Sequence, residues 1–321
     1  MKKIKIIIPY FGRLPKFFPY FLLTAKRNKR IDFLIYTDQK VEQFSKVNAQ
    51  NISFVNISFD TLKKKIQSKF DFKISLDTPY KLCDYKVAYG FIFKEELENY
   101  DYWGFCDTDV LLGDIYHFLE ENDFFTKNYA RYGLLGHLQI YKNTEEVNTV
   151  FMTGIDLGYR LNYRNVFTSE QTFIFDEARG IQKLFEKTCL KQLQKNYFDD
   201  LDIANFSFRN YGEGKTQRYY YWSEKEGLES IELKDNQVKV KHPLYVHFQK
   251  RLIDCPEFIN SKEFYVVPNR LVLGERLSIE EIQKLTQNKF YWEHIEKTFL
   301  KKFKREKWTL GFIRHKLRMR R

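Results

Sequence analysis

The chain of 321 residues carries 54 Lys and Arg against 42 Asp and Glu, and 43% of its residues are hydrophobic. It is too long for a disulfide-stapled miniprotein and, with 14 Gly and 7 Pro, too apolar for a disordered chain. No apolar run reaches the ~18 to 20 residues of a membrane helix, and the run that ends at Pro9 is shorter than a signal peptide needs. We therefore expect a cytoplasmic protein with a large core.

The four cysteines are scattered along the chain and have no histidine partners at zinc-ligand spacing. They indicate neither a disulfide framework nor a structural zinc site.

The net charge of +12 is concentrated near the C-terminus. Residues 297–321 contain eleven Lys and Arg and one acid, whereas the other 296 residues carry 43 basic and 41 acidic side chains. Apolar residues recur at helical spacing in this tail, at Phe299, Phe303, Leu310, Ile313 and Leu317. The pattern predicts a basic amphipathic helix that binds an anionic membrane surface, and a helix docked on the rest of the chain is the alternative.

The first half of the chain alternates between strand and helix patterns. Strands are predicted over 5–10, 31–37, 52–59 and 102–106, and helices over 15–28, 61–70 and 80–97. This alternation predicts an α/β fold with a mainly parallel sheet flanked by helices, in which ligands bind at the carboxyl ends of the strands.

The second half begins with a short helix over 115–122 and a strand over 134–141. A strand over 172–175 and a helix over 178–194 are predicted next. Residues 198–248 are rich in turns and include strands over 237–241 and 244–248. We expect one compact catalytic unit followed by a C-terminal helical extension.

Two carboxylates, Asp107 and Asp109, follow the apolar strand 102–106. A strand that delivers two acids to its end can hold a divalent cation that bridges the phosphate oxygens of a nucleotide diphosphate. In the alternative reading, Asp107 caps the strand and Asp109 opens a turn.

The order of several short motifs resembles nucleotide-sugar glycosyltransferases of the GT-A type, and more narrowly those of bacterial capsular and exopolysaccharide clusters. The motifs lie at 6–10, 36–38, 80–86, 107–109, 175–177 and 245–251. The resemblance covers residues 1–251 and implies a GT-A (Rossmann-like) catalytic domain. Its nucleotide-binding half would span 1–115 and its acceptor half 116–251, with an extension over 252–321.

The resemblance also implies roles for individual residues. Asp107 and Asp109 would hold Mn²⁺ or Mg²⁺ on the donor diphosphate, and His247 would complete the metal shell. Lys250 and Arg251 would neutralise the leaving diphosphate. The alternative for His247 is a half-buried residue on an alternating strand.

Asp176 and Glu177 follow the predicted strand 172–175. Either carboxylate could deprotonate an acceptor hydroxyl, and Asp176 is the first candidate. Alternatively, Asp176 is a helix N-cap and Glu177 a favourable acid of the first turn.

Further residues are placed near the ligands by the resemblance. The donor nucleotide would meet residues at the ends of the first two strands and in the helix before the acidic motif, namely Pro9, Tyr10, Asp38, Lys81 and Asp84. Lys81 and Asp84 are also spaced for an intrahelical ion pair, and Asp38 also suits a turn. His137 and Asn143 would meet the acceptor, although His137 is also explained as a structural residue.

The leading hypothesis is a metal-dependent transferase that moves galactose, galactofuranose or glucose from a UDP-sugar to a lipid-linked saccharide, with inversion. It would work peripherally at the inner face of the cell membrane. A haloacid-dehalogenase-type phosphatase, which also has an Asp-x-Asp motif at a strand end, is a second hypothesis. In those phosphatases, however, the motif is followed by Thr or Val at the position of Leu111, and it normally lies on the first strand. A nucleic-acid-binding protein is the third, but the near-neutral body disfavours it.

Overall fold

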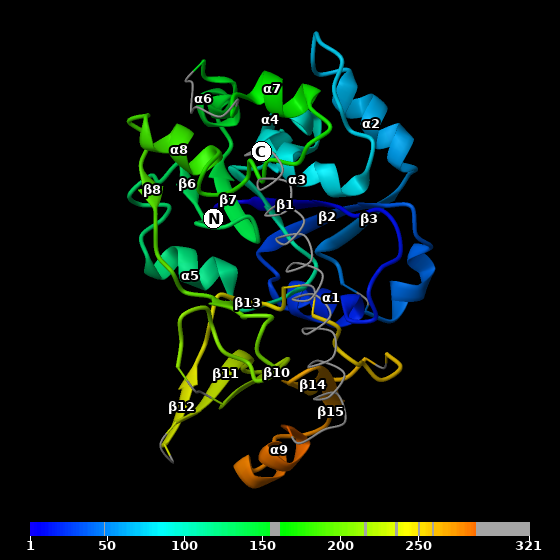
Figure 1. Cartoon of the computed structure of the whole chain (residues 1–321), viewed down its shortest axis with the longest axis vertical. Coiled ribbons are helices and arrows are strands. Elements are labelled where there is room, and N and C mark those ends of the chain that lie inside the picture. Colours follow the sequence, from blue (N-terminus) through cyan, green and yellow to red (C-terminus); the bar gives the residue numbers. More distant parts are fainter. Residues whose placement is uncertain are drawn as a thin grey trace, which may run out of the picture.

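The structure, a computed structural model, describes residues 1–47, 49–154, 161–214, 217–234, 237–249, 251–258 and 260–286. Figure 1 shows a central sheet with helices on both sides and, beyond α1, a separate group of antiparallel strands. The acidic motif lies where the central sheet meets a small third sheet.

The central sheet has seven strands in the order β3-β2-β1-β4-β7-β6-β8. The strands are β1 (Ile4–Pro9), β2 (Ile31–Thr37), β3 (Ile52–Asn56), β4 (Tyr102–Cys106), β6 (Arg131–Tyr132), β7 (Leu138–Lys142) and β8 (Gln192–Leu193). The first four are parallel, whereas β7 runs antiparallel to β4. The predicted α/β fold with a mainly parallel sheet is therefore confirmed, and the predicted bounds of β2 and β4 match the structure.

Both faces of this sheet are buried, because successive side chains of β1 point to opposite sides. Ile6 and Ile8 join the core beneath α1 (Phe18–Arg27) and α5 (Ile115–Glu121), and Ile7 joins the core of the opposite face. That second core includes residues of α2 (Phe59–Gln67) and α7 (Tyr163–Thr168). A parallel sheet covered on both faces needs the continuous apolar run that the sequence shows at 6–8.

A second sheet of five antiparallel strands has the order β12-β11-β10-β14-β15. Its strands are β10 (Gln217–Ser223), β11 (Gly227–Lys234), β12 (Gln237–Lys241), β14 (Glu263–Val267) and β15 (Arg270–Leu273). Tyr20 of α1 packs edge-on against Phe264 of β14, with ring centroids 5.2 Å apart, which joins this sheet to the central unit. Since β14 and β15 complete the sheet, the predicted boundary at residue 251 falls within one packed structure.

The outer face of this second sheet is covered by α9 (Ile279–Thr286), whose Ile282 is 1% exposed among Tyr219, Tyr221 and Tyr265. The predicted extension thus begins with two strands and one helix. Its basic tail over 297–321 lies outside the described residues.

The single helix predicted over 80–97 is wrong. The chain instead forms five short turns: η2 (Pro79–Lys81), α3 (Leu82–Tyr85), η3 (Lys86–Ala88), α4 (Tyr89–Ile92) and η4 (Glu95–Leu97). Regular helix stops at Ala88, with φ −101° and ψ 3°, and at Phe93, with φ −107° and ψ 33°. Between them, Gly90 packs so tightly on Trp103 that a Cβ would lie 2.4 Å from the indole nitrogen. Packing against β4 therefore overrides the helical pattern.

The strand predicted over 172–175 is also wrong, because its backbone amides bond to a side chain. Phe173 and Phe175 donate their N–H groups to the buried carboxylate of Asp84, and Ile174 between them has φ +54°. The helix predicted over 178–194 is reduced to α8 (Ile181–Glu186), after which the chain forms β8. The remaining short elements are η1 (Val41–Val47), α6 (Glu145–Asn148) and η5 (Val150–Met152).

Within the part of the chain that the structure describes, no helix combines the length and the apolar character needed to cross a bilayer.

Candidate metal and donor site

A sheet of three short strands, β5 (Val110–Leu112), β13 (Tyr245–His247) and β9 (Asp199–Asp200), forms the floor of the site. His247 pairs with Val110 on one side and with Asp200 on the other. Phe248 donates its backbone N–H to the carbonyl of Asp109 at 3.0 Å. This small sheet brings residues near 109, 200 and 247 into one place at the carboxyl end of β4.

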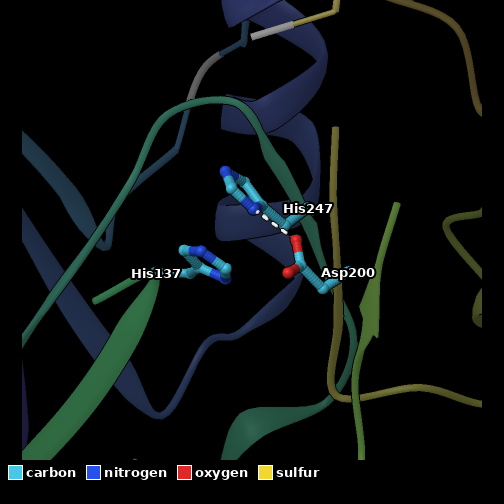
Figure 2. Close-up of side chains that lie close together, drawn as sticks. All are labelled: His137, Asp200 and His247. Carbon is cyan, nitrogen blue, oxygen red and sulfur yellow. Dashed lines mark hydrogen bonds and ion pairs between the residues drawn. The ribbon is translucent and has the colours of Figure 1, made fainter. Parts of the chain in front are cut away.

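Asp107, Asp109 and His247 each offer a ligand atom, and these atoms lie within 4.8 Å of one another. His247 Nδ1 lies 2.9 Å from Asp200 Oδ1 (Figure 2), and its Nε2 lies 3.4 Å from Asp109 Oδ1. When Nδ1–H donates to Asp200, the lone pair of Nε2 faces the acidic pair. At metal sites, a histidine ligand usually donates its other ring N–H to a carboxylate, which fixes the orientation of the ring.

The donor set fits the metal that the sequence predicts. Two carboxylates and one imidazole suit Mn²⁺, which accepts mixed oxygen and nitrogen ligands, while carboxylates suit Mg²⁺. The charges agree: burial lowers the pKa of His247, but hydrogen bonds to Asp109 and Asp200 outweigh it and raise the pKa to about 9. Protonated His247 thus partly balances the negative charge of the nearby carboxylates, and a divalent cation would balance more of it.

His137 lies beside this site, with its ring centroid 3.6 Å from that of His247 (Figure 2). It precedes β7, and its carbonyl accepts the N–H of Asp107 at 2.8 Å. Burial and the neighbouring charge of His247 lower the pKa of His137 to about 4, so its imidazole is neutral. The structure therefore places His137 beside His247.

Lys86 connects the acidic motif to the second acid pair. Its Nζ donates to Asp107 Oδ1 at 2.7 Å and to the carbonyl of Gly136 at 2.8 Å, and it lies 3.2 Å from Asp176 Oδ2. Burial lowers the pKa of Lys86, but the charges of Asp107 and Asp176 outweigh it and raise the pKa well above its usual range. Lys86 is therefore a permanent cation within the site.

The Asp176–Glu177 pair divides between a buried and a reachable carboxylate. Asp176 is 2% exposed, and a Cβ at Gly136 would lie 2.3 Å from its Oδ2, so only glycine fits there. Burial raises the pKa of Asp176 to about 6. Glu177 is half-buried; burial raises its pKa, the charge of Lys86 lowers it, and the charge of Asp107 raises it. Glu177 is therefore the more exposed carboxylate of the pair.

Lys81 and Asp84, which were expected at the nucleotide, form the ion pair of the alternative interpretation. Lys81 is 3% exposed and Asp84 is fully buried, with Lys81 Nζ 2.7 Å from Asp84 Oδ2. Lys81 also donates to the carbonyls of Val166 and Gln171. Because these groups are enclosed and already bonded, they anchor the segment that precedes Asp176.

The structure also encloses Arg251, which was expected at the diphosphate. The side chain is 7% exposed and donates to the carbonyls of Asp202, Asn205 and Phe206 and to the amide of Asn269. These four bonds hold both terminal nitrogens of the guanidinium inside the fold. Lys250 lies outside the described residues.

Asn143, which was expected at the acceptor, lies at the end of β4 opposite the acidic motif. It follows β7, which runs antiparallel to β4, so Asn143 lies beside Asp101 rather than beside Asp107. Its amide donates to the carbonyls of Leu97 and Tyr100 at 2.9 Å.

Pro9, Tyr10 and Asp38 do lie at the carboxyl edge, where the parallel strands β1 and β2 end. Burial raises the pKa of Tyr10, and the charge of Asp109 raises it further. Asp38 is exposed and accepts the N–H of Gly12 at 3.1 Å. Their contact with a nucleotide stays a prediction.

The sequence prediction gives no role to two site residues, Asp200 and Lys86, although Lys86 ends the motif at 80–86. Lys86 has helical spacing that suits any surface lysine, and Asp200 follows no apolar strand of predictable length. The adjacent acids at 199–200 are a weak signal, because acid pairs are common in loops.

Comparison with known proteins links the chain to an uncharacterised family. The family of unknown function DUF6625 matches residues 6–275. A comparison with curated proteins found no match.

Three solved structures show partial similarity. Apo mouse xyloside xylosyltransferase 1 has 9% identity over 63% of this chain and 87% of that chain, with a TM-score of 0.36. The mannosyltransferase Ktr4p from S. cerevisiae has 15% identity over 42% of this chain and 39% of that chain, with a TM-score of 0.26. A glycosyltransferase involved in glycosylation of the major capsid of PBCV-1 has 9% identity over 62% of this chain and 84% of that chain, with a TM-score of 0.30.

Proposed function

We propose that this chain, which belongs to the DUF6625 family, is a metal-dependent glycosyltransferase that uses a nucleotide-diphosphate sugar. One observation carries the proposal: Asp107, Asp109 and His247 converge at the carboxyl end of β4, with Asp200 fixing the His247 ring. The donor set suits a divalent cation, and its place at a strand end suits a nucleotide diphosphate.

A divalent cation bound there would neutralise charge on the departing diphosphate. Lys86 would keep Asp107 oriented, because its ammonium bonds to Oδ1 of that carboxylate and leaves Oδ2 for the cation. Lys86 is also tied to Asp176 and to the Gly136 carbonyl, so it cannot swing away without breaking three contacts. Asp176 therefore acts as a positioning residue.

Glu177 is the better candidate for the base that deprotonates the acceptor. Asp176 lies behind Gly136 and Lys86, so an acceptor hydroxyl would reach Glu177 first. The acceptor oxygen would form a bond to the anomeric carbon as the bond from that carbon to the diphosphate oxygen breaks. The hydroxyl proton would pass to Glu177, and the anomeric configuration would invert.

The identity of donor and acceptor rests on the sequence resemblance. We propose a UDP-hexose, with galactose, galactofuranose or glucose as the sugar, and a lipid-linked saccharide of capsular or exopolysaccharide synthesis as the acceptor. The basic tail over 297–321 supports a cytoplasmic enzyme at the membrane surface, because eleven cationic side chains would attract anionic lipids.

A thermal-shift screen of nucleotide diphosphates, with and without Mn²⁺, tests the metal and donor site. A ligand at 100 times its Kd stabilises the native state by about 2.7 kcal/mol, so a nucleotide that binds with Mn²⁺ raises the unfolding temperature. Asp109→Asn should abolish the Mn²⁺-dependent part of the shift. Asp71→Asn is the matched control, because Asp71 is 77% exposed and pairs with Arg164 on the surface. A shift that persists in Asp109→Asn would contradict the metal site.

Glu177→Gln tests the base. Loss of a general base costs on the order of 10² to 10⁴ in turnover, whereas the KM for the donor should stay near that of the wild type. NMR of the product should show an inverted anomeric configuration. Retained configuration would remove the base role from Glu177.

The phosphatase hypothesis predicts hydrolysis of a phosphomonoester without a sugar donor. The acidic motif follows the fourth strand rather than the first, which disfavours this hypothesis. Phosphatase activity that survives removal of every nucleotide sugar would support it.

A further inference from the structure

His137 is a buried imidazole that the proposed transfer reaction does not use. It is 7% exposed, and within the described part of the chain its Nδ1 is buried without a hydrogen-bond partner. A buried polar atom that lacks a partner is costly, and native structures seldom leave one without a reason. An unobserved ligand is such a reason.

The surroundings of His137 identify the ligand class. His137, Asp200 and His247 each offer a ligand atom, and these atoms lie within 4.8 Å of one another (Figure 2). The three side chains come from different parts of the fold, since Asp200 lies on β9, His247 on β13 and His137 just before β7. Two imidazoles and one carboxylate make a set richer in nitrogen than Asp107, Asp109 and His247.

Nitrogen-rich sets favour late first-row cations. Imidazole suits Zn²⁺, whereas carboxylates suit Mg²⁺ and Mn²⁺, and Zn²⁺ binds more tightly than Mn²⁺ to most sites of this kind. Three protein ligands with a water in the fourth position is a common arrangement for Zn²⁺. The His137, Asp200 and His247 set therefore suits Zn²⁺.

His247 belongs to both sets, and its two nitrogens face different carboxylates. Nδ1 faces Asp200 at 2.9 Å, and Nε2 faces Asp109 at 3.4 Å. A neutral imidazole has one lone pair, because its other nitrogen carries the proton. A cation on Nδ1 thus leaves Nε2 protonated and turned toward Asp109, while a cation on Nε2 requires the opposite tautomer.

We propose that His137, Asp200 and His247 form an alternative site for Zn²⁺, and that Zn²⁺ bound there excludes Mn²⁺ from Asp107, Asp109 and His247. Zinc would then inhibit the enzyme by competing for one histidine from a neighbouring position. The zinc site stands on the described residues alone, whereas the competition rests on the proposed function.

The test measures metal binding directly on the full-length, metal-free protein. Isothermal titration calorimetry gives the affinity for Zn²⁺, and the electron paramagnetic resonance signal of free Mn²⁺ gives the affinity for Mn²⁺. His137→Ala should weaken Zn²⁺ binding by about tenfold or more, as expected for loss of a ligand, and leave the affinity for Mn²⁺ within about twofold. Asp107→Asn with Asp109→Asn should do the reverse. In the wild type, added Zn²⁺ should release bound Mn²⁺.

Two further variants keep the result interpretable. His242→Ala removes an exposed histidine and should change neither affinity. His137→Gln fills more of the space than alanine and should weaken Zn²⁺ binding to a similar extent. Similar losses in both variants would show that the missing ligand, and not a cavity, weakens the binding. Circular dichroism checks that each variant is folded.

Unchanged Zn²⁺ affinity in both His137 variants would overturn the zinc site. Zn²⁺ and Mn²⁺ bound together, one of each per chain, would overturn the exclusion. If Zn²⁺ binds through His137 while Mn²⁺ does not bind the wild type, the zinc site stands and the proposed function fails.

Discussion

The buried pair Lys81 and Asp84 offers the sharpest test of how the fold holds the second acid pair. The two side chains are 3% and 0% exposed and 2.7 Å apart, so neither charge has water as a substitute partner. We predict that Lys81→Met or Asp84→Asn alone lowers the free energy of unfolding by about 3 to 5 kcal/mol, the usual cost of leaving one buried charge without its partner.

The double variant separates the pair from its surroundings. Lys81→Met with Asp84→Asn leaves no buried charge, so its cost should be smaller than the sum of the two single costs by about 2 kcal/mol or more. The variants are compared by urea unfolding, in which the midpoint should fall while the slope stays constant. Lys94→Met is the control, because the Lys94–Glu145 pair is 3.7 Å apart and 68% and 72% exposed. That variant should not change the midpoint measurably.

Loss of the Lys81–Asp84 pair should also reduce the turnover of the enzyme. Asp84 holds the amides of Phe173 and Phe175, directly before Asp176 and Glu177. In a folded Asp84→Asn protein, turnover should therefore fall more than nucleotide binding. Single variants that lose less than about 1 kcal/mol, or costs that simply add, would refute the reasoning.

Three further outcomes are expected. Gly136→Ala places a Cβ 2.3 Å from Asp176 Oδ2, so it should cost about 1 to 3 kcal/mol in chemical unfolding and reduce turnover; wild-type behaviour would contradict the close packing. Asp200→Asn leaves His247 without its carboxylate, so calorimetry should show Mn²⁺ affinity reduced about 10- to 100-fold, and an unchanged affinity would deny Asp200 this role. The pKa of Asp176 is raised to about 6, so its buried charge destabilises the native protein increasingly as the pH rises from about 4 to 6. The difference in unfolding free energy between Asp176→Asn and the wild type should therefore shift by up to about 3 kcal/mol in favour of the variant as the pH rises from about 4 to 6. A difference that does not change with pH would contradict the raised pKa.

The four parallel strands of the central sheet could be predicted from the sequence. β2 and β4 match the predicted bounds, because each is a short apolar run bounded by turn residues. The prediction of secondary structure failed in segments whose backbone conformation depends on tertiary contacts and not on the spacing of apolar residues. The segment 80–97 has a helical pattern, but it forms short turns that pack on β4, with Gly90 close to Trp103. The segment 172–175 has a strand composition, but its amides bond to Asp84 instead of to a neighbouring strand.

The acidic pair at 107–109 was predictable because its signal lies in adjacent residues: two carboxylates directly follow one apolar strand. The residues that contact this pair are distant from it in the sequence. Lys86 reaches Asp107 across 21 positions of the chain, and Asp200 reaches His247 across 47. Arg251 has the charge that a diphosphate requires, yet its burial commits it to backbone carbonyls.

The sequence by itself determined the α/β class, the two carboxylates at a strand end and the basic tail, since these depend on residue type and on neighbours along the chain. Only the tertiary structure decided which charges meet. Hydrogen bonds and ion pairs act over about 3 Å, and residues such as 86, 107, 176, 200 and 247 come within that range through the packing of separate strands and turns.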